Sequence, residues 1–122
     1  MSILVVDDDP IARLIIEKNL KLLNYGDSIQ KADNGEEALF LIEENPPSAI
    51  FLDLNMPIKG GFEVLDELRA SNKDILVFVI TSSSLSADRE KCSEYKCVKG
   101  FFEKPVLKND IERVIQLLNE KN

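Results

Sequence analysis

Short apolar runs alternate with helix-like patterns along the whole chain. We expect strands near residues 2–7, 28–33, 48–53, 75–81 and 98–102. Between and after them, helical patterns occur near 10–24, 35–45, 61–71, 86–96 and 107–120. The last pattern is the clearest, because an apolar stripe with the period of a helix runs through Ile111, Val114, Ile115 and Leu118.

The apolar runs at 49–52 and 75–80 do not alternate between apolar and polar residues. Continuous runs of this kind are typical of strands buried on both faces, as in parallel sheets covered by helices. Five strand–helix units with short connections therefore predict a doubly wound α/β domain.

Three local signals predict where helices begin and end. Pro10 behind Asp9 favours a helix start, with Asp9 as the cap. Asp33 followed by Glu36 predicts a reciprocal cap on the second helix. Asn45 precedes two prolines, which ends that helix, because a residue before proline is pushed out of helical geometry.

Composition and charge exclude several classes of protein. The chain has 122 residues, the size of one domain, and its net charge of −7 argues against sequence-independent nucleic-acid binding. No signal peptide and no apolar stretch near 18 residues is present, so we expect a cytoplasmic protein that does not enter a membrane. Histidine is absent, which excludes a Ser–His triad and a histidine metal site. Cys92 and Cys97, five residues apart on a predicted helix, point in different directions and are expected to be free thiols.

Reactive side chains follow four of the predicted strands. Asp7 and Asp8 come after the first, Asp53 ends the third, Thr81 ends the fourth and Lys104 follows the last. In open parallel sheets, ligands bind outside the carboxyl ends of the strands. We therefore expect these groups to form one small pocket.

The predicted pocket needs cations, because Asp7, Asp8 and Asp53 carry a charge of −3 and repel one another. A divalent ion together with Lys104 would supply +3. Oxygen ligands select a hard ion, so we expect Mg²⁺ or Mn²⁺. A carboxylate can also attack phosphorus as a nucleophile and form an aspartyl phosphate.

Four motifs in this order and spacing resemble the receiver domains of bacterial two-component response regulators, of the CheY-like type. They are Val5-Val6-Asp7-Asp8-Asp9-Pro10, Asp53-Leu54-Asn55-Met56-Pro57, Ile80-Thr81-Ser82 and Phe102-Glu103-Lys104-Pro105. The resemblance covers the whole chain and implies one receiver domain over 1–122. It also implies a flavodoxin-like (βα)5 sandwich, with five parallel strands in the order 2-1-3-4-5 and helices on both faces.

The resemblance assigns roles in the metal site and the acceptor site. Asp53 would accept a phosphoryl group from a phosphohistidine of a sensor kinase or a histidine phosphotransfer protein. Asp8 would bind Mg²⁺ directly and Asp7 through water, and the backbone carbonyl of Asn55 would complete the metal site.

Further roles concern the phosphoryl group and the conformational switch. By resemblance, the Thr81 hydroxyl and Lys104 would each contact a phosphoryl oxygen, and the Lys104–Pro105 bond would be cis. Phe101 stands where the family often has a switch tyrosine, so its ring can swing but has no hydroxyl to bond. Ser83 is a candidate for controlling the access of water to the phosphoryl group.

One loop departs from the family pattern. After Asp53 the family usually has an acidic residue before its glycine, whereas this chain has Lys59-Gly60-Gly61. We expect this loop to be more flexible and less acidic, which affects its contribution to kinase contact.

The leading interpretation is a phosphorylation-dependent switch and not a turnover enzyme. Its output would be a downstream protein bound through residues about 86–120, or onward relay of the phosphoryl group, as a monomer or a phosphorylation-dependent dimer. An aspartate-based phosphatase of the haloacid dehalogenase type would need an acid where Asn55 stands, and a dinucleotide-binding module would need a G-x-G-x-x-G motif after the first strand. A stand-alone receiver and a piece of a longer regulator look alike at this level.

Overall fold

The computed structural model describes residues 2–25, 28–71, 73–82 and 86–121. The strands are β1 (Ile3–Val6), β2 (Ile29–Ala32), β3 (Ala49–Asp53), β4 (Leu76–Thr81) and β5 (Val98–Glu103). The helices are α1 (Pro10–Leu22), α2 (Gly35–Glu44), α3 (Gly61–Ser71), α4 (Ser86–Cys92) and α5 (Lys108–Lys121). All paired strands are parallel and their order is β2-β1-β3-β4-β5, which confirms the predicted doubly wound α/β fold.

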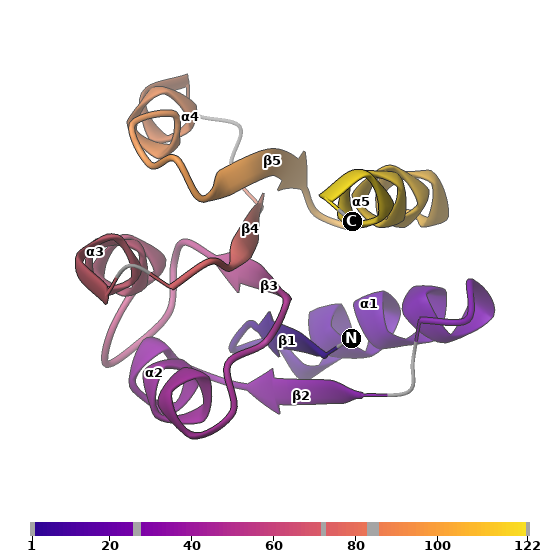
Figure 1. The fold of residues 1–122 in the computed structure, drawn as a ribbon, viewed down its shortest axis with the longest axis horizontal. Helices are drawn as coiled ribbons and strands as arrows, with labels where there is room; N and C mark the ends of the chain where they lie inside the picture. The colour runs from indigo at the N-terminus through magenta and orange to yellow at the C-terminus, as the bar shows by residue number, and fades with distance from the viewer. Residues whose placement is uncertain (1, 26–27, 72, 83–85, 122) are drawn as a thin grey trace.

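The sheet separates two hydrophobic cores. Helices α1 and α5 cover one face, and α2, α3 and α4 cover the other (Figure 1). In β3, Ala49 and Phe51 pack into the α1–α5 core, whereas Ile50 and Leu52 pack into the core under α2 to α4. Because both faces are buried, every position of β3 is buried, which explains why its sequence does not alternate.

The helix starts follow local capping chemistry. Asp9 caps α1, since its side chain accepts a hydrogen bond from the Ile11 backbone N–H at 2.9 Å. The predicted cap on α2 is wrong by one residue: Asn34, not Asp33, accepts from the Glu37 backbone N–H at 2.9 Å. The cause is that Asn34 has extended backbone and α2 begins at the residue after it, while the Asp33 carboxylate accepts from the Asn34 side chain.

Helix α4 is shorter than expected, because it ends at Cys92 and not near residue 96. The N–H of Tyr95 bonds the carbonyl of Cys92 in a tight turn, and Tyr95 is buried, only 5% exposed. Cys97 therefore lies outside the helix. Cys92 is buried and Cys97 half-buried, and both are free thiols, as expected. Burial raises the pKa of the Cys92 thiol to about 11.

In the described ranges, no helix combines the length and the apolar character that crossing a bilayer requires.

Candidate functional site

The carboxyl edge of the sheet brings the predicted residues together. Asp7 directly follows β1, and Asp53 and Thr81 are the last residues of β3 and β4. Lys104 follows β5, and its backbone N–H donates to the carbonyl of Thr81 at 2.8 Å. The Lys104–Pro105 peptide bond is cis, the conformation implied by the resemblance. Four strand ends therefore meet at one pocket.

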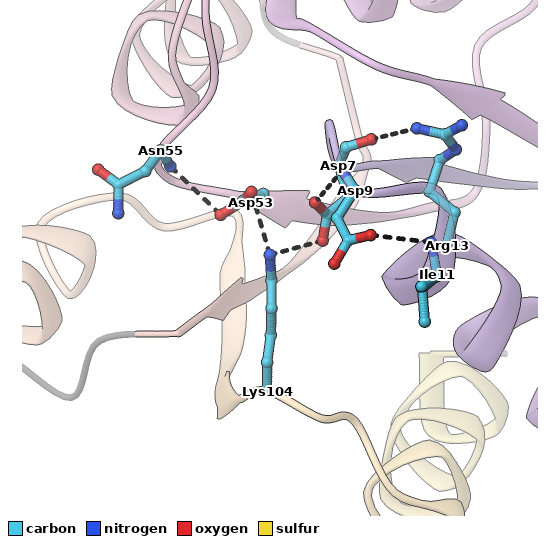
Figure 2. A network of polar contacts seen from close by, with 7 residues as sticks. All are labelled: Asp7, Asp9, Ile11, Arg13, Asp53, Asn55 and Lys104. Carbon is cyan, nitrogen blue, oxygen red and sulfur yellow. Dashed lines mark hydrogen bonds and ion pairs between the residues drawn. The ribbon is translucent and has the colours of Figure 1, made fainter.

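A lysine bridges the two buried carboxylates of this pocket. The Nζ atom of Lys104 lies 2.7 Å from Asp7 Oδ2 and 3.2 Å from Asp53 Oδ2 (Figure 2). Asp7 is fully buried and Asp53 is 3% exposed, whereas the side chain of Lys104 is 19% exposed. The Lys104 side chain is thus largely covered where it contacts the two acids.

Backbone N–H groups fix the other oxygen of each buried acid. The N–H of Asp9 donates to Asp7 Oδ1 at 2.9 Å, and the N–H of Asn55 donates to Asp53 Oδ1 at 3.2 Å. Both bonds span two residues, so the turn after each strand orients the carboxylate that it follows. Figure 2 shows the two bonds on either side of Lys104.

Negative charge exceeds positive charge in the pocket. Carboxylate oxygens of Asp7, Asp8 and Asp53 lie within 4.8 Å of one another, and one ammonium group bridges two of them. Burial, followed by the nearby charge of Asp7, raises the pKa of Asp53 to about 6, against the opposing effects of Lys104 and the Asn55 N–H. Burial lowers the pKa of Lys104, but its contacts with Asp7 and Asp53 outweigh this, and the pKa is raised.

The donor set fits a divalent cation. The buried Oδ2 atom of Asp7 accepts no hydrogen bond from the described part of the chain, and its close contact is the ion pair with Lys104. Lys104 is shared with Asp53, so its single positive charge offsets only part of the negative charge of the three acids. Asp8 is exposed and can turn toward the same point. Oxygen atoms alone favour a hard ion such as Mg²⁺ over a soft one.

Arg13 also belongs to the site, although it was not among the residues predicted for it. Its guanidinium Nη1 donates to the backbone carbonyl of Asp7 at 2.6 Å, a contact visible in Figure 2. A helical side chain points back toward the helix N-terminus, and Arg13 lies in the first turns of α1. That position was the available signal, because it directs a long cationic side chain toward the end of β1.

The proposed switch residues share one face of the sheet. Val79 on β4 is in register with Phe101 on β5, and Val79 belongs to the core under α2 to α4, on which Phe101 packs half-buried. Side chains alternate along a strand, so Thr81, two residues after Val79, lies on the same face. Thr81 is fully buried. Ser83 lies outside the described residues.

Three contacts constrain the loop after β3. The Gly35 N–H at the start of α2 donates to the Lys59 carbonyl at 2.9 Å, and the Gly61 N–H donates to the Leu54 carbonyl at 3.1 Å. The Lys59 ammonium lies 2.8 Å from Glu67 of α3. The greater flexibility expected of this loop stays a prediction, and these contacts are what such motion would have to break.

The fold and the pocket together define the class. A parallel sheet in the order β2-β1-β3-β4-β5, covered by helices on both faces and carrying an acidic pocket at its carboxyl edge, is a CheY-like α/β domain. Comparison with known proteins gives the family, because residues 3–116 match the response regulator receiver domain. The chain belongs to this family.

Individual relatives agree with this assignment. The chain is 37% identical over 123 residues to the transcriptional regulatory protein PrrA of Mycobacterium tuberculosis, with 98% of this chain and 50% of PrrA covered. It is 30% identical over 120 residues to the sensor protein EvgS of Escherichia coli, with 96% and 10% covered. The chain thus spans at most half the length of these two relatives.

A solved structure shows the same similarity in three dimensions. The DNA-binding response regulator of the LuxR family from Staphylococcus aureus superposes with a TM-score of 0.83 at 30% identity. The superposition covers 98% of this chain and 99% of that one.

Proposed function

We propose that this protein is a phosphorylation-dependent switch in two-component signalling, with Asp53 as the phosphoacceptor. The observation that carries the proposal is the placement of Asp53. Its carboxylate is held by a backbone N–H and by Lys104, within 4.8 Å of two further acids, and is 3% exposed while Asp7 is closed to solvent. Of the two buried acids, Asp53 is the one that keeps some exposure to solvent, which supports its role as acceptor.

The chemical step is a transfer from nitrogen to oxygen. A carboxylate oxygen of Asp53 forms a bond to the phosphorus of a phosphohistidine on a sensor kinase or histidine phosphotransfer protein. The N–P bond breaks, and its electron pair stays on the imidazole nitrogen. Transfer of this kind depends on positioning and on neutralising the equatorial oxygens. Lys104, which already contacts Asp53, would shift to contact one oxygen of the transferred phosphoryl group. The Thr81 hydroxyl would bind another of its oxygens.

We propose that the pocket holds Mg²⁺ or Mn²⁺. The ligands would be the carboxylates of Asp7, Asp8 and Asp53 and the backbone carbonyl of Asn55. The peptide group of Asn55 lies at the pocket, since its N–H contacts Asp53. When bound, the ion neutralises charge on the acids and on the phosphoryl oxygens. In this proposal the chain catalyses only its own phosphorylation and dephosphorylation.

A phosphohistidine donor would approach beside α1. A cavity of about 290 Å³ borders Lys104 and Pro105 and is lined on its other side by α1. Ile11 of this lining is 66% exposed, and neighbouring Leu14 is 60% exposed. Exposed apolar residues next to the acceptor suit a partner that docks through an apolar surface.

The response would involve Thr81 and Phe101, which lie on one face of adjacent strands. Movement of Thr81 toward a phosphoryl group changes the space beside the Phe101 ring, and so changes the surface formed by residues 86–120. We propose that a downstream protein in the cytoplasm binds this surface, or that the phosphoryl group is passed on to another protein. The acidic charge of −7 argues against nucleic acid as the target. The active form would be a monomer or a phosphorylation-dependent dimer.

Phosphorylation by acetyl phosphate with Mg²⁺, followed by intact-mass measurement, tests this proposal. We expect one phosphoryl group on the wild type and none on Asp53→Asn. Asp9→Asn is the matched control, because Asp9 is an exposed cap whose substitute also caps helices, and it should be labelled like the wild type. Equal labelling of Asp53→Asn would contradict the proposal. Steady turnover of p-nitrophenyl phosphate would instead favour the phosphatase.

A further inference from the structure

We propose that Arg89 is a positioning residue that holds the Phe101 ring in the unphosphorylated conformation and so opposes activation. This inference rests on the proposed function, because it assigns a regulatory role at the same switch. The contact joins α4 to β5, two elements whose relative position no local pattern of residues specifies.

The contact is a cation over an aromatic face. The guanidinium carbon of Arg89 lies 5.1 Å from the centroid of the Phe101 ring. Distances below about 6 Å are those of an attractive cation–π interaction. Arg89 is on the exposed side of α4, and Phe101 is half-buried on β5, so the guanidinium covers the part of the ring that the core does not.

Within the described residues, the cation recorded over the Phe101 ring is that of Arg89. A tyrosine at this position could form different hydrogen bonds in two positions, whereas a phenylalanine ring offers a partner only its face and edge. A cation above the face is therefore the directional contact by which the rest of the molecule can favour one ring position over another.

Helix α4 is weakly attached to the domain, which makes its side-chain contacts important. Its buried residue is Cys92. Besides Arg89 over Phe101, the ammonium of Lys91 lies 4.2 Å from the centroid of Phe62 on α3. In the described part of the chain, two cation–π contacts thus link this short helix to neighbouring elements, and the one from Arg89 involves a ring on β5, the strand paired with β4, which carries Thr81.

The contact links the acceptor to the output surface. Phe101 is paired with Val79, and Thr81 is two residues further along β4 on the same face. If Thr81 moves toward a phosphoryl group, the Phe101 ring can move into the vacated space. Its contact with the Arg89 guanidinium is then broken. A contact present in one of two conformations biases the equilibrium toward that conformation. Removing the Arg89 contact should therefore favour the phosphorylated conformation.

The affinity for beryllofluoride with Mg²⁺ measures this bias. The complex mimics the phosphoryl group on Asp53, and its binding can be followed through the amide NMR signals of Thr81 and Lys104. We expect Arg89→Gln to bind beryllofluoride about two- to fivefold more tightly than the wild type, the factor given by one cation–π contact at a partly exposed site. Arg89→Lys, which keeps the cation, should fall between the two.

Lys91→Gln is the matched control. It removes the same charge and a cation–π contact from the same helix, but at Phe62. We expect its beryllofluoride affinity to equal that of the wild type. A general loss of positive charge would instead weaken anion binding in both variants, opposite to the change expected for Arg89→Gln.

A double-mutant cycle assigns the effect to the ring. In the background of Phe101→Leu, which keeps the apolar contact and removes the π face, Arg89→Gln should cause no further change. An unchanged or weaker affinity in Arg89→Gln, or an equal tightening in the Phe101→Leu background, would overturn the inference. Failure of the wild type to bind beryllofluoride would instead overturn the proposed function.

Discussion

The pocket at the ends of β1 and β3 and the face formed by α4 and β5 are stabilised in different ways. In the pocket, buried carboxylates are each fixed by a backbone N–H and share one lysine at 2.7 and 3.2 Å. On the α4–β5 face, a seven-residue helix has one buried residue and is linked to its neighbours by cation–π contacts.

This difference matches what each region would have to do in a switch. Phosphoryl transfer needs groups held in place before the donor arrives, because catalysis of this reaction is mostly positioning. A responding surface needs two arrangements of similar free energy, and weak, separable contacts give this property. Substitutions in the pocket should therefore change stability more than substitutions on the α4–β5 face.

Loss of Lys104 should destabilise the pocket most. Lys104→Met keeps the volume of the stem but leaves Asp7 and Asp53 without their shared cation. We expect the free energy of unfolding to fall by about 3 kcal/mol at pH 7 in a chelator, measured by denaturant titration, with a native fold retained. Mg²⁺ should recover part of the loss, because it neutralises the same acids. Lys59→Met is the control, since its partner Glu67 is at the surface, and it should change stability little.

The pKa of Asp53 predicts a pH-dependent effect in metal-free solution. A pKa raised from 3.8 to about 6 means that the folded protein holds this proton more tightly than the unfolded chain. The stability from this group is therefore full below about pH 4 and is lost as the pH rises to about 6. In Asp53→Asn the side chain cannot ionise, so this pH-dependent loss of stability is absent, although the ion pair with Lys104 is lost as well. We expect the variant to be about 2 kcal/mol more stable than the wild type at pH 7.

Thermal or denaturant unfolding from pH 4 to pH 7 in a chelator measures this effect. The gain of Asp53→Asn should grow across the interval and then level off. Asp9→Asn should show no such growth. A gain that stays constant with pH would show that Asp53 is ionised throughout, and that its burial has a smaller electrostatic cost than inferred.

Two adjacent glycines allow a test of how tightly the pocket is packed. A Cβ atom on Gly61 would lie 2.5 Å from the carbonyl oxygen of Asp53, whereas one on Gly60 would meet its nearest atom at 3.3 Å. Gly61→Ala should therefore shift the end of β3, lower stability by about 1 to 2 kcal/mol and weaken Mg²⁺ binding. Gly60→Ala should be tolerated. Similar Mg²⁺ affinities in the two variants would mean that the pocket is less rigid than its contacts indicate.

The smallest expected effect is on the α4–β5 face. Lys91→Gln removes the contact with Phe62 and should lower the global free energy of unfolding by about 0.5 kcal/mol. Native-state hydrogen exchange should show a smaller opening free energy for the α4 amides than for the β3 amides, in the wild type and in the variant, because a short helix with one buried residue can open while the sheet stays folded. Equal opening free energies in the two elements would mean that α4 is part of the same cooperative unit as the pocket.

Much of the molecule could be predicted because the relevant signals are local or follow from strand direction. The runs at 49–52 and 75–80 identified buried strands, and parallel strands place their ends at one edge. Asp7, Asp53 and Lys104 could therefore be expected in one pocket, where the ion pairs now join them. The two errors concern helix ends. The cap at Asn34 and the stop at Cys92 depend on one turn of backbone, and at Cys92 on the burial of Tyr95.

The type of fold and the chemical groups at the carboxyl edge follow from the amino-acid sequence, because hydrophobic periodicity and chain order are properties of the chain alone. The pairing of those groups depends on how the folded elements pack. Three contacts join elements that are separate in the sequence. They are the Lys104 bridge between the two acids, the hydrogen bond from Arg13 to the Asp7 carbonyl, and the Arg89 guanidinium over the Phe101 ring. Contacts of this kind depend on distances of a few ångströms between packed elements, which no local pattern of residues specifies.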